Sequence, residues 1–193
     1  MIRSLQSGLS RELALRTLSP PWPFGILRRW MTGRLLGVGE IYIPYRLYRV
    51  NVEHRGARSI RFLAVDATTG ALDPYEFSED IAAERCVEVE TRNCLPIRLE
   101  EAETQALVLE KVRRLLFSRG LFLSGAPTFA AERAGPEFYI PYWAGFFGEH
   151  HDVRVLVLNA VRGTMEGSKV AGVVKAWLLE RADDHLSAAR VGA

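Results

Sequence analysis

Tyr42-Ile43-Pro44-Tyr45 is repeated letter for letter as Tyr139-Ile140-Pro141-Tyr142, 97 residues further along a chain of 193. Both copies lie in segments rich in aromatic and β-branched residues, a composition typical of strands. Proline removes a backbone donor, so within a sheet it favours a strand start or an edge strand. We therefore predict that each copy opens the first strand of a separate structural unit.

A second pair of segments extends this similarity beyond four letters. Residues 60–70 align with residues 153–163 at a constant offset of 93, which pairs Asp66 with Asn159 and Gly70 with Gly163. The alignment offset changes from 97 to 93 at the tip of the predicted hairpin. A difference in loop length costs little there, because the tip lies at the surface. We interpret the chain as a duplicated unit, and two unrelated hairpins of similar composition are the alternative.

Helical patterns flank the predicted sheets. Short helices are predicted over 4–18 and 24–36, separated by the proline-rich stretch Ser19-Pro20-Pro21-Trp22-Pro23, in which the helical backbone is disfavoured. A longer helix is predicted over 99–118, with glutamates in its first turn and arginines near its end, as the helix dipole prefers. Its expected buried face consists of Ala102, Ala106, Leu109, Val112 and Leu116. A last helix is predicted over 173–181.

The predicted fold class is α+β, with two tandem α-β-β-β repeat units, each a helix with an antiparallel sheet, and a basic N-terminal helical arm. The arm covers 1–39 and is expected to pack on the first unit, which covers 40–98, and the second unit covers 99–193. The strands are predicted, by period-2 patterns and turn residues, at 40–53, 61–66, 72–77, 86–90, 138–147, 153–158 and 164–170.

Charge is distributed unevenly along the chain. The net charge is +2, which argues against a protein that coats nucleic acid, but residues 1–39 carry six arginines and one glutamate. Residues 22–36 combine apolar bulk with Arg28, Arg29, Arg34 and Trp30, a combination that suits an anionic membrane surface or an acidic partner. Packing of this segment on the first sheet is the alternative. Nucleic-acid binding is not expected, because phosphate contacts need a continuous basic face.

Cysteine content and hydropathy bear on the compartment. Cys86 and Cys94 are too few for a disulfide scaffold, so free thiols are expected. Arg11, Glu12 and Arg16 interrupt the place where the apolar core of a signal peptide would lie. No segment approaches the ~20 apolar residues that cross a bilayer. The predicted localisation is cytoplasmic.

The segment Arg61 to Gly70 reads Arg-Phe-Leu-Ala-Val-Asp-Ala-Thr-Thr-Gly. This apolar strand running into Asp-Ala-x-Thr-Gly resembles the closing strand and turn of PepSY domains, which likewise combine a helix with an antiparallel sheet. A tandem pair of such units resembles the architecture of β-lactamase inhibitory proteins. The second unit carries Asn159 in place of Asp66 and Arg162 in place of a threonine. The resemblance implies a non-catalytic binding or inhibitory module.

Few residues indicate a metal site or a catalytic site. His150-His151-Asp152 is the densest group of metal-capable side chains, but neighbours in a strand point to opposite faces, and zinc needs three or four convergent ligands. Asp66 follows a strand, where a carboxylate commonly caps a turn. No catalytic triad or phosphate-binding loop is present in the sequence. We therefore predict that the protein is not an enzyme, and we assign no metal and no cofactor.

The aromatic strands suggest binding, because tyrosine and tryptophan combine a large contact area with a polar group. The predicted function is a non-enzymatic intracellular protein-binding module whose partner the sequence does not identify. Its predicted binding surface consists of Tyr42, Tyr45, Tyr48, Tyr139, Tyr142 and Trp143. Ordinary core packing of these side chains is the structural alternative. The functional alternatives are a small-molecule or lipid binder with a pocket between helix and sheet, and association with anionic membranes through 22–36. A homodimer is left open.

Overall fold

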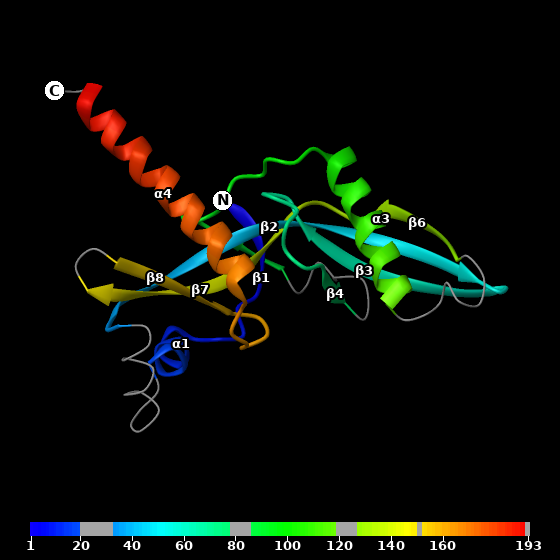
Figure 1. Cartoon of the computed structure of the whole chain (residues 1–193), viewed down its shortest axis with the longest axis horizontal. Coiled ribbons are helices and arrows are strands. Elements are labelled where there is room, and N and C mark those ends of the chain that lie inside the picture. Colours follow the sequence, from blue (N-terminus) through cyan, green and yellow to red (C-terminus); the bar gives the residue numbers. More distant parts are fainter. Residues whose placement is uncertain (20–32, 78–85, 119–126, 150–151, 192–193) are drawn as a thin grey trace. The chain divides into compact units, whose positions relative to one another are not determined.

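A computed structural model of the chain describes residues 1–19, 33–77, 86–118, 127–149 and 152–191 (Figure 1). These residues form three helices and one mixed, largely antiparallel sheet of eight strands, which confirms the predicted α+β class. The helices are α1 (Arg11–Leu18), α3 (Glu101–Ser118) and α4 (Ser168–Val191). The strands are β1 (Ile2–Leu5), β2 (Leu35–His54), β3 (Ala57–Asp66), β4 (Tyr75–Phe77), β5 (Cys86–Val89), β6 (Thr128–Arg133), β7 (Phe138–Glu149) and β8 (Asp152–Asn159).

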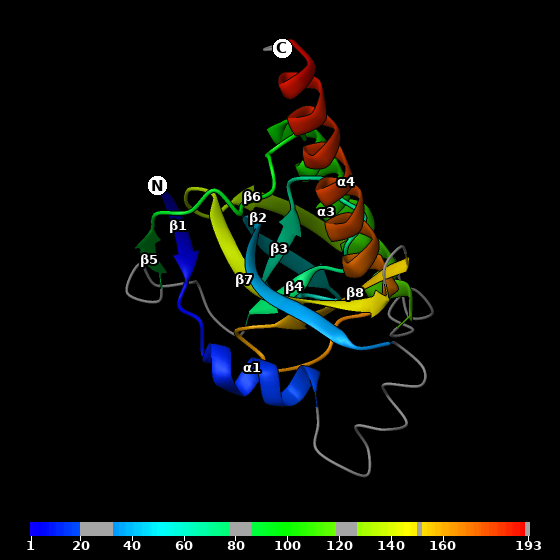
Figure 2. The same cartoon turned by 90° about the vertical axis from the view of Figure 1, so that its left-hand side faces the viewer.

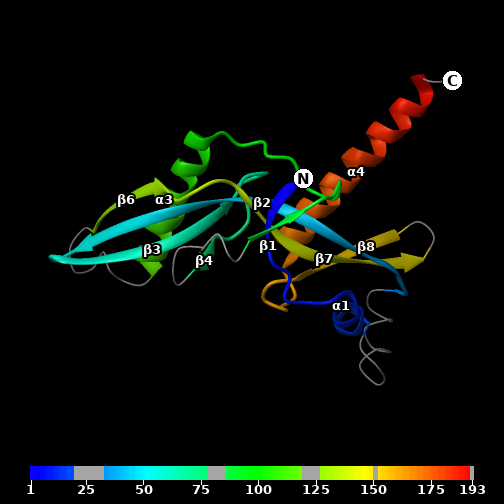
Figure 3. The ribbon, with the colours of Figure 1, turned by 180° about the vertical axis from the view of Figure 1, so that it is seen from behind.

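The sheet has the order β4-β3-β2-β7-β1-β5, with β6 paired to β2 and β8 paired to β7. β2 is the longest strand, with 20 residues, and it forms a long hairpin with β3 (Figure 3). The two residues that connect them, Arg55 and Gly56, both have positive φ angles, of 52° and 78°. This turn geometry matches the twist of the two flanking strands, and glycine adopts it without strain.

The described contacts divide the chain into two compact units, and neither unit is contiguous in sequence. The first compact unit consists of Met1–Gln6 and Tyr42–Ile140, and the second consists of Ser7–Ile41 and Pro141–Ala193. The chain therefore passes from one unit to the other at both copies of Tyr-Ile-Pro-Tyr. These units differ from the contiguous segments 40–98 and 99–193 expected from the sequence.

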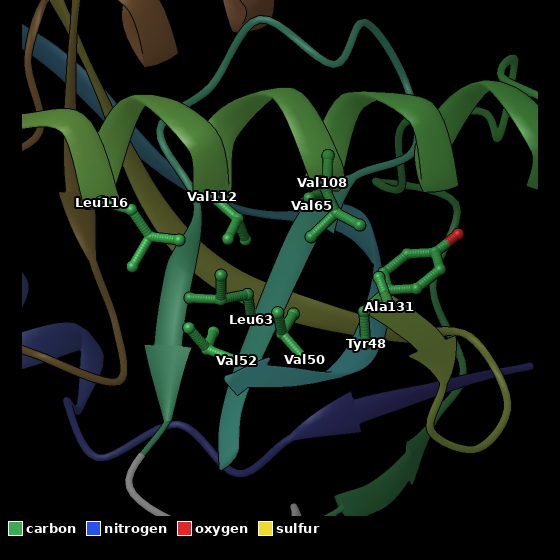
Figure 4. Packing of buried hydrophobic residues seen from close by; sticks show 9 residues of the cluster. All are labelled: Tyr48, Val50, Val52, Leu63, Val65, Val108, Val112, Leu116 and Ala131. Atoms are coloured by element: carbon green, nitrogen blue, oxygen red, sulfur yellow. The ribbon is translucent and has the colours of Figure 1, made fainter. Parts of the chain in front are cut away.

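The core of the first compact unit lies between α3 and the inner face of β2, β3 and β6 (Figure 4). Alternate residues of a strand face the same side, so β2 turns Tyr48, Val50 and Val52 toward the helix. The cluster consists of Tyr48, Val50, Val52, Leu63, Val65, Val108, Val112, Leu116 and Ala131. The space between helix and sheet is thus filled by side chains.

The core of the second compact unit forms between α1 and the strands β7 and β8 (Figure 2). The Ser10 hydroxyl accepts a hydrogen bond from the Leu13 backbone N–H at 3.3 Å and caps the start of α1. Leu18 ends the helix and is fully buried. It packs closely against Gly145, because a Cβ atom added at Gly145 would lie 3.1 Å from Leu18 Cδ1. The sequence predicts that residues 1–39 pack on the 40–98 unit, whereas α1 packs on β7 and β8.

Three predicted elements differ from the structure. Residues 2–5, assigned in part to the first predicted helix, form β1, because they pair antiparallel with β5. The helix predicted over 24–36 lies mostly outside the described residues, and its last two residues, Leu35 and Leu36, belong to β2. The strand predicted over 164–170 is reduced to one bridge between Met165 and Leu158, and α4 begins at Ser168.

Candidate functional site

Five of the six side chains predicted to form a binding surface are buried. The exposed fraction is 1% for Tyr48 and for Tyr142, 2% for Tyr45, 6% for Tyr42 and 8% for Trp143, whereas Tyr139 is half-buried. Trp143 donates its indole N–H to the Leu9 carbonyl at 3.1 Å. The five buried side chains pack within the compact units and offer little surface to a partner.

The basic segment 22–36 lies largely outside the described residues. Arg28, Arg29 and Trp30 fall there, as do His150 and His151, while Arg34 is exposed and its carbonyl accepts a hydrogen bond from the Gly148 N–H at 3.1 Å. Among the residues that are described, no group of three His, Cys, Asp or Glu side chains converges on a metal-sized site. Over the same residues, no helix is long and apolar enough to cross a bilayer.

A polar network surrounds Arg46 in the first compact unit. The side chain of Arg46 is buried, and its Nε donates to the Glu137 carboxylate at 3.1 Å. Its Nη1 donates to the Leu99 carbonyl at 2.7 Å and to the Thr104 hydroxyl at 3.2 Å. Thr104 also shares a hydrogen bond of 2.6 Å with the Tyr48 hydroxyl. These bonds tie β2 to the start of α3.

Arg133 extends this network toward solvent. It pairs with Glu137 at 2.9 Å and also with Glu101. Burial alone would raise the pKa of Glu137, but a hydrogen bond from its own backbone and the guanidinium groups of Arg46 and Arg133 hold that pKa below its ordinary value. The buried guanidinium of Arg46 therefore has a charged partner, and loss of that partner would leave it uncompensated.

The two strand-closing loops are built in the same way. Asp66 is fully buried, and its carboxylate accepts hydrogen bonds from the backbone N–H groups of Thr69 at 2.7 Å and Leu72 at 3.0 Å. In the other loop, the Asn159 amide oxygen accepts from the backbone N–H groups of Val161 at 3.0 Å and Arg162 at 2.9 Å. This is the turn-capping role that the sequence predicts for Asp66.

An open hollow lies on β2, β3 and β6, and most of its lining residues, those in register with Asn51, face away from α3, whereas Val52, Ser59 and Phe129 belong to the face that packs on the helix. It has a volume of about 580 Å³. We call it the outer-face hollow, and its lining consists of Arg49, Asn51, Val52, Glu53, Arg58, Ser59, Ile60, Thr128, Phe129 and Ala130. All of these residues belong to the first compact unit.

Strand register arranges the outer-face hollow in rows. Asn51 in the middle of the hollow lies directly opposite Ile60, whose side chain is 52% exposed. Glu53 lies opposite Arg58 and forms an exposed ion pair with it at 3.5 Å. Arg49 lies at the other end. Guanidinium and amide donors beside an aliphatic side chain can bind a polar ligand with an apolar part.

The sequence alone does not predict this hollow. The alternation along β2 separates Arg49, Asn51 and Glu53 from the buried residues between them, but it does not show which face a helix covers. Comparison of the chain with protein-family models, with curated proteins and with solved structures gives no match.

Proposed function

We propose that this protein is a non-enzymatic protein-binding module, built from two copies of one helix-and-sheet unit. Equivalent backbone contacts support the duplication. The Ala67 N–H donates to the Pro44 carbonyl at 2.9 Å, and the Ala160 N–H donates to the Pro141 carbonyl at 3.0 Å. The strand registers agree as well, since the second tyrosine of each Tyr-Ile-Pro-Tyr pairs with the loop-capping residue, Asp66 or Asn159.

The loops that follow these strands also support the duplication. Both end on a glycine in the left-handed region, with φ of 68° at Gly70 and 69° at Gly163. Without a side chain at Cα, glycine adopts this conformation at little cost. Each helix that precedes a Tyr-Ile-Pro-Tyr strand, α1 or α3, packs on the hairpin of the other copy. The two copies thus exchange their helices within one chain.

The outer-face hollow is the binding surface of this proposal. The observation that carries it is a hollow of about 580 Å³ on the sheet, in which exposed charged side chains surround the exposed Ile60. The alternative of a small-molecule pocket between helix and sheet has less support, because side chains of the first core fill that space. Protein partners commonly recognise a polar surface with an apolar centre.

Selection of peptides from a displayed random library on the immobilised full-length protein tests this function. The Ile60→Arg variant places a charged side chain in the hollow, and we expect it to abolish binding of the selected peptides. The Phe117→Arg variant is the matched control, because Phe117 is 71% exposed on α3, which lies on the opposite face of the sheet. The proposal fails if no peptide is selected, or if Ile60→Arg and the wild type bind the peptides equally.

A further inference from the structure

We infer that the outer-face hollow binds an extended acidic segment of a partner protein, with two acidic residues four positions apart and an apolar residue midway between them. This inference rests on the proposed function and adds the chemistry of the partner. It follows from the spacing of two arginines, Arg49 and Arg58, about an exposed isoleucine, Ile60.

The two arginines lie at opposite ends of the hollow. Arg49 is four residues from Glu53 along β2, which corresponds to roughly 13 Å in a strand that rises about 3.4 Å per residue. Arg58 lies directly across from Glu53 on β3. Ile60 lies across from Asn51, halfway along this distance. The surface therefore presents cation, apolar side chain and cation in sequence.

An extended chain matches this spacing. Its residues i, i+2 and i+4 point to one side, and the first and last are roughly 13 Å apart. In an α-helix the side chains of i and i+4 are separated by only about 6 Å, so one helical turn does not reach both arginines. A segment of the type acidic-x-apolar-x-acidic would place its carboxylates on Arg49 and Arg58 and its central side chain on Ile60.

The charges in the hollow are available to a ligand. Glu132 lies on β6, directly opposite Arg49. Neither of these two side chains forms an ion pair with another described residue. Arg58 is paired with Glu53, but the two side chains are 83% and 49% exposed. Exposed pairs of this kind are weak. A carboxylate that meets the guanidinium fork with two hydrogen bonds can replace Glu53.

Fluorescence anisotropy with labelled synthetic peptides tests the inference on the full-length protein. The acidic probe carries Glu-Thr-Val-Thr-Glu between Gly-Ser flanks, and the comparison probe carries Gln-Thr-Val-Thr-Gln. We expect the acidic probe to bind about tenfold more tightly, because hydrogen bonds between charged groups are stronger than neutral ones. Arg49→Ala and Arg58→Ala should each lower this preference by about threefold, since each removes one of two carboxylate contacts, whereas Glu53→Gln should strengthen binding by freeing Arg58.

Arg113→Ala is the matched control, because Arg113 is exposed on α3 in the same compact unit but outside the hollow. The double variant Arg49→Glu, Arg58→Glu should in turn prefer a Lys-Thr-Val-Thr-Lys probe. Equal loss of binding in Arg113→Ala would indicate nonspecific charge attraction and overturn the inference. If library-selected peptides bind the hollow but the acidic probe shows no preference over its amide counterpart, the partner chemistry is wrong while the proposed function stands.

Discussion

The guanidinium of Arg46 is buried, and its hydrogen-bond partners are far from it in sequence. Glu137 is 91 residues away, and Leu99 is 53 residues away. A buried charge without partners would be strongly destabilising, so each of these contacts is needed for Arg46 to occupy the core side of β2. The sequence does not predict this network, because Arg46 lies within an otherwise largely apolar strand segment and nothing near it in sequence shows its partners.

Glu137 should make the stability of the protein sensitive to acid. The pKa of its carboxyl in the folded protein lies below the ordinary value of 4.5, so its contribution is present at neutral pH and is lost as the pH falls through the folded-state pKa. At pH 7 we expect Glu137→Gln to lower the free energy of unfolding by about 1–2 kcal/mol, the scale of a charged hydrogen bond. Urea unfolding at pH 7 and pH 3 measures this difference, which should shrink at pH 3.

Glu110→Gln is the control for this measurement. Glu110 forms an ion pair with Arg114 on the surface of α3, and both side chains are more than half exposed. Such a pair contributes little, so this variant should follow the wild type at both pH values. A Glu137→Gln difference of the same size at pH 7 and pH 3 would contradict the argument.

At the scale of single elements, α3 shows what local signals predict well. The sequence predicts it over 99–118 and it spans Glu101–Ser118, because apolar spacing and glutamates in the first turn are properties of neighbouring residues, whereas the last turn carries no basic residue. Its buried face was predicted less well. Ala102 and Ala106 are exposed, and the buried stripe is Thr104, Val108, Val112 and Leu116. Thr104 replaces an apolar residue in this stripe because its hydroxyl binds Tyr48 and Arg46.

Leu18→Ala should destabilise the protein much more than Leu13→Ala, although both positions lie in α1. Leu18 is fully buried against β7 and β8, whereas Leu13 is 48% exposed. Removal of a buried leucine side chain costs about 2–5 kcal/mol through lost burial and the cavity left behind. An exposed substitution usually changes stability by about 0.5 kcal/mol or less. Urea unfolding of both variants checks the prediction, and similar losses would show that α1 is not anchored through Leu18.

At the scale of the whole molecule, neither hydrophobic core is encoded by one contiguous half of the chain. The first core combines Tyr48, Val50 and Leu63 with residues of α3 and β6, and the second combines Ala14 and Leu18 with residues of β7 and β8. A cut at the predicted boundary between residues 98 and 99 would therefore divide both cores.

Fragments 1–98 and 99–193 should each fail to fold alone and should fold when mixed. Each fragment contains only part of each hydrophobic core, so its apolar core residues would remain exposed without the other fragment. Burial of apolar surface is the main favourable contribution to folding. Circular dichroism and the amide dispersion in NMR spectra measure folding of the separate and mixed fragments. A cooperative unfolding transition in either fragment by itself would contradict the prediction, and a full-length chain serves as the positive control.

The sequence by itself determined features that depend on near neighbours: the α+β class, the helix 99–118, the β2–β3 hairpin and the turns capped by Asp66 and Asn159. It also revealed the repeated Tyr-Ile-Pro-Tyr. Only the tertiary structure decided which hairpin each helix covers, why the tyrosines are buried and which sheet face remains open. A strand pattern of period two defines two faces but does not say which one is covered, because the covering residues lie elsewhere in the chain.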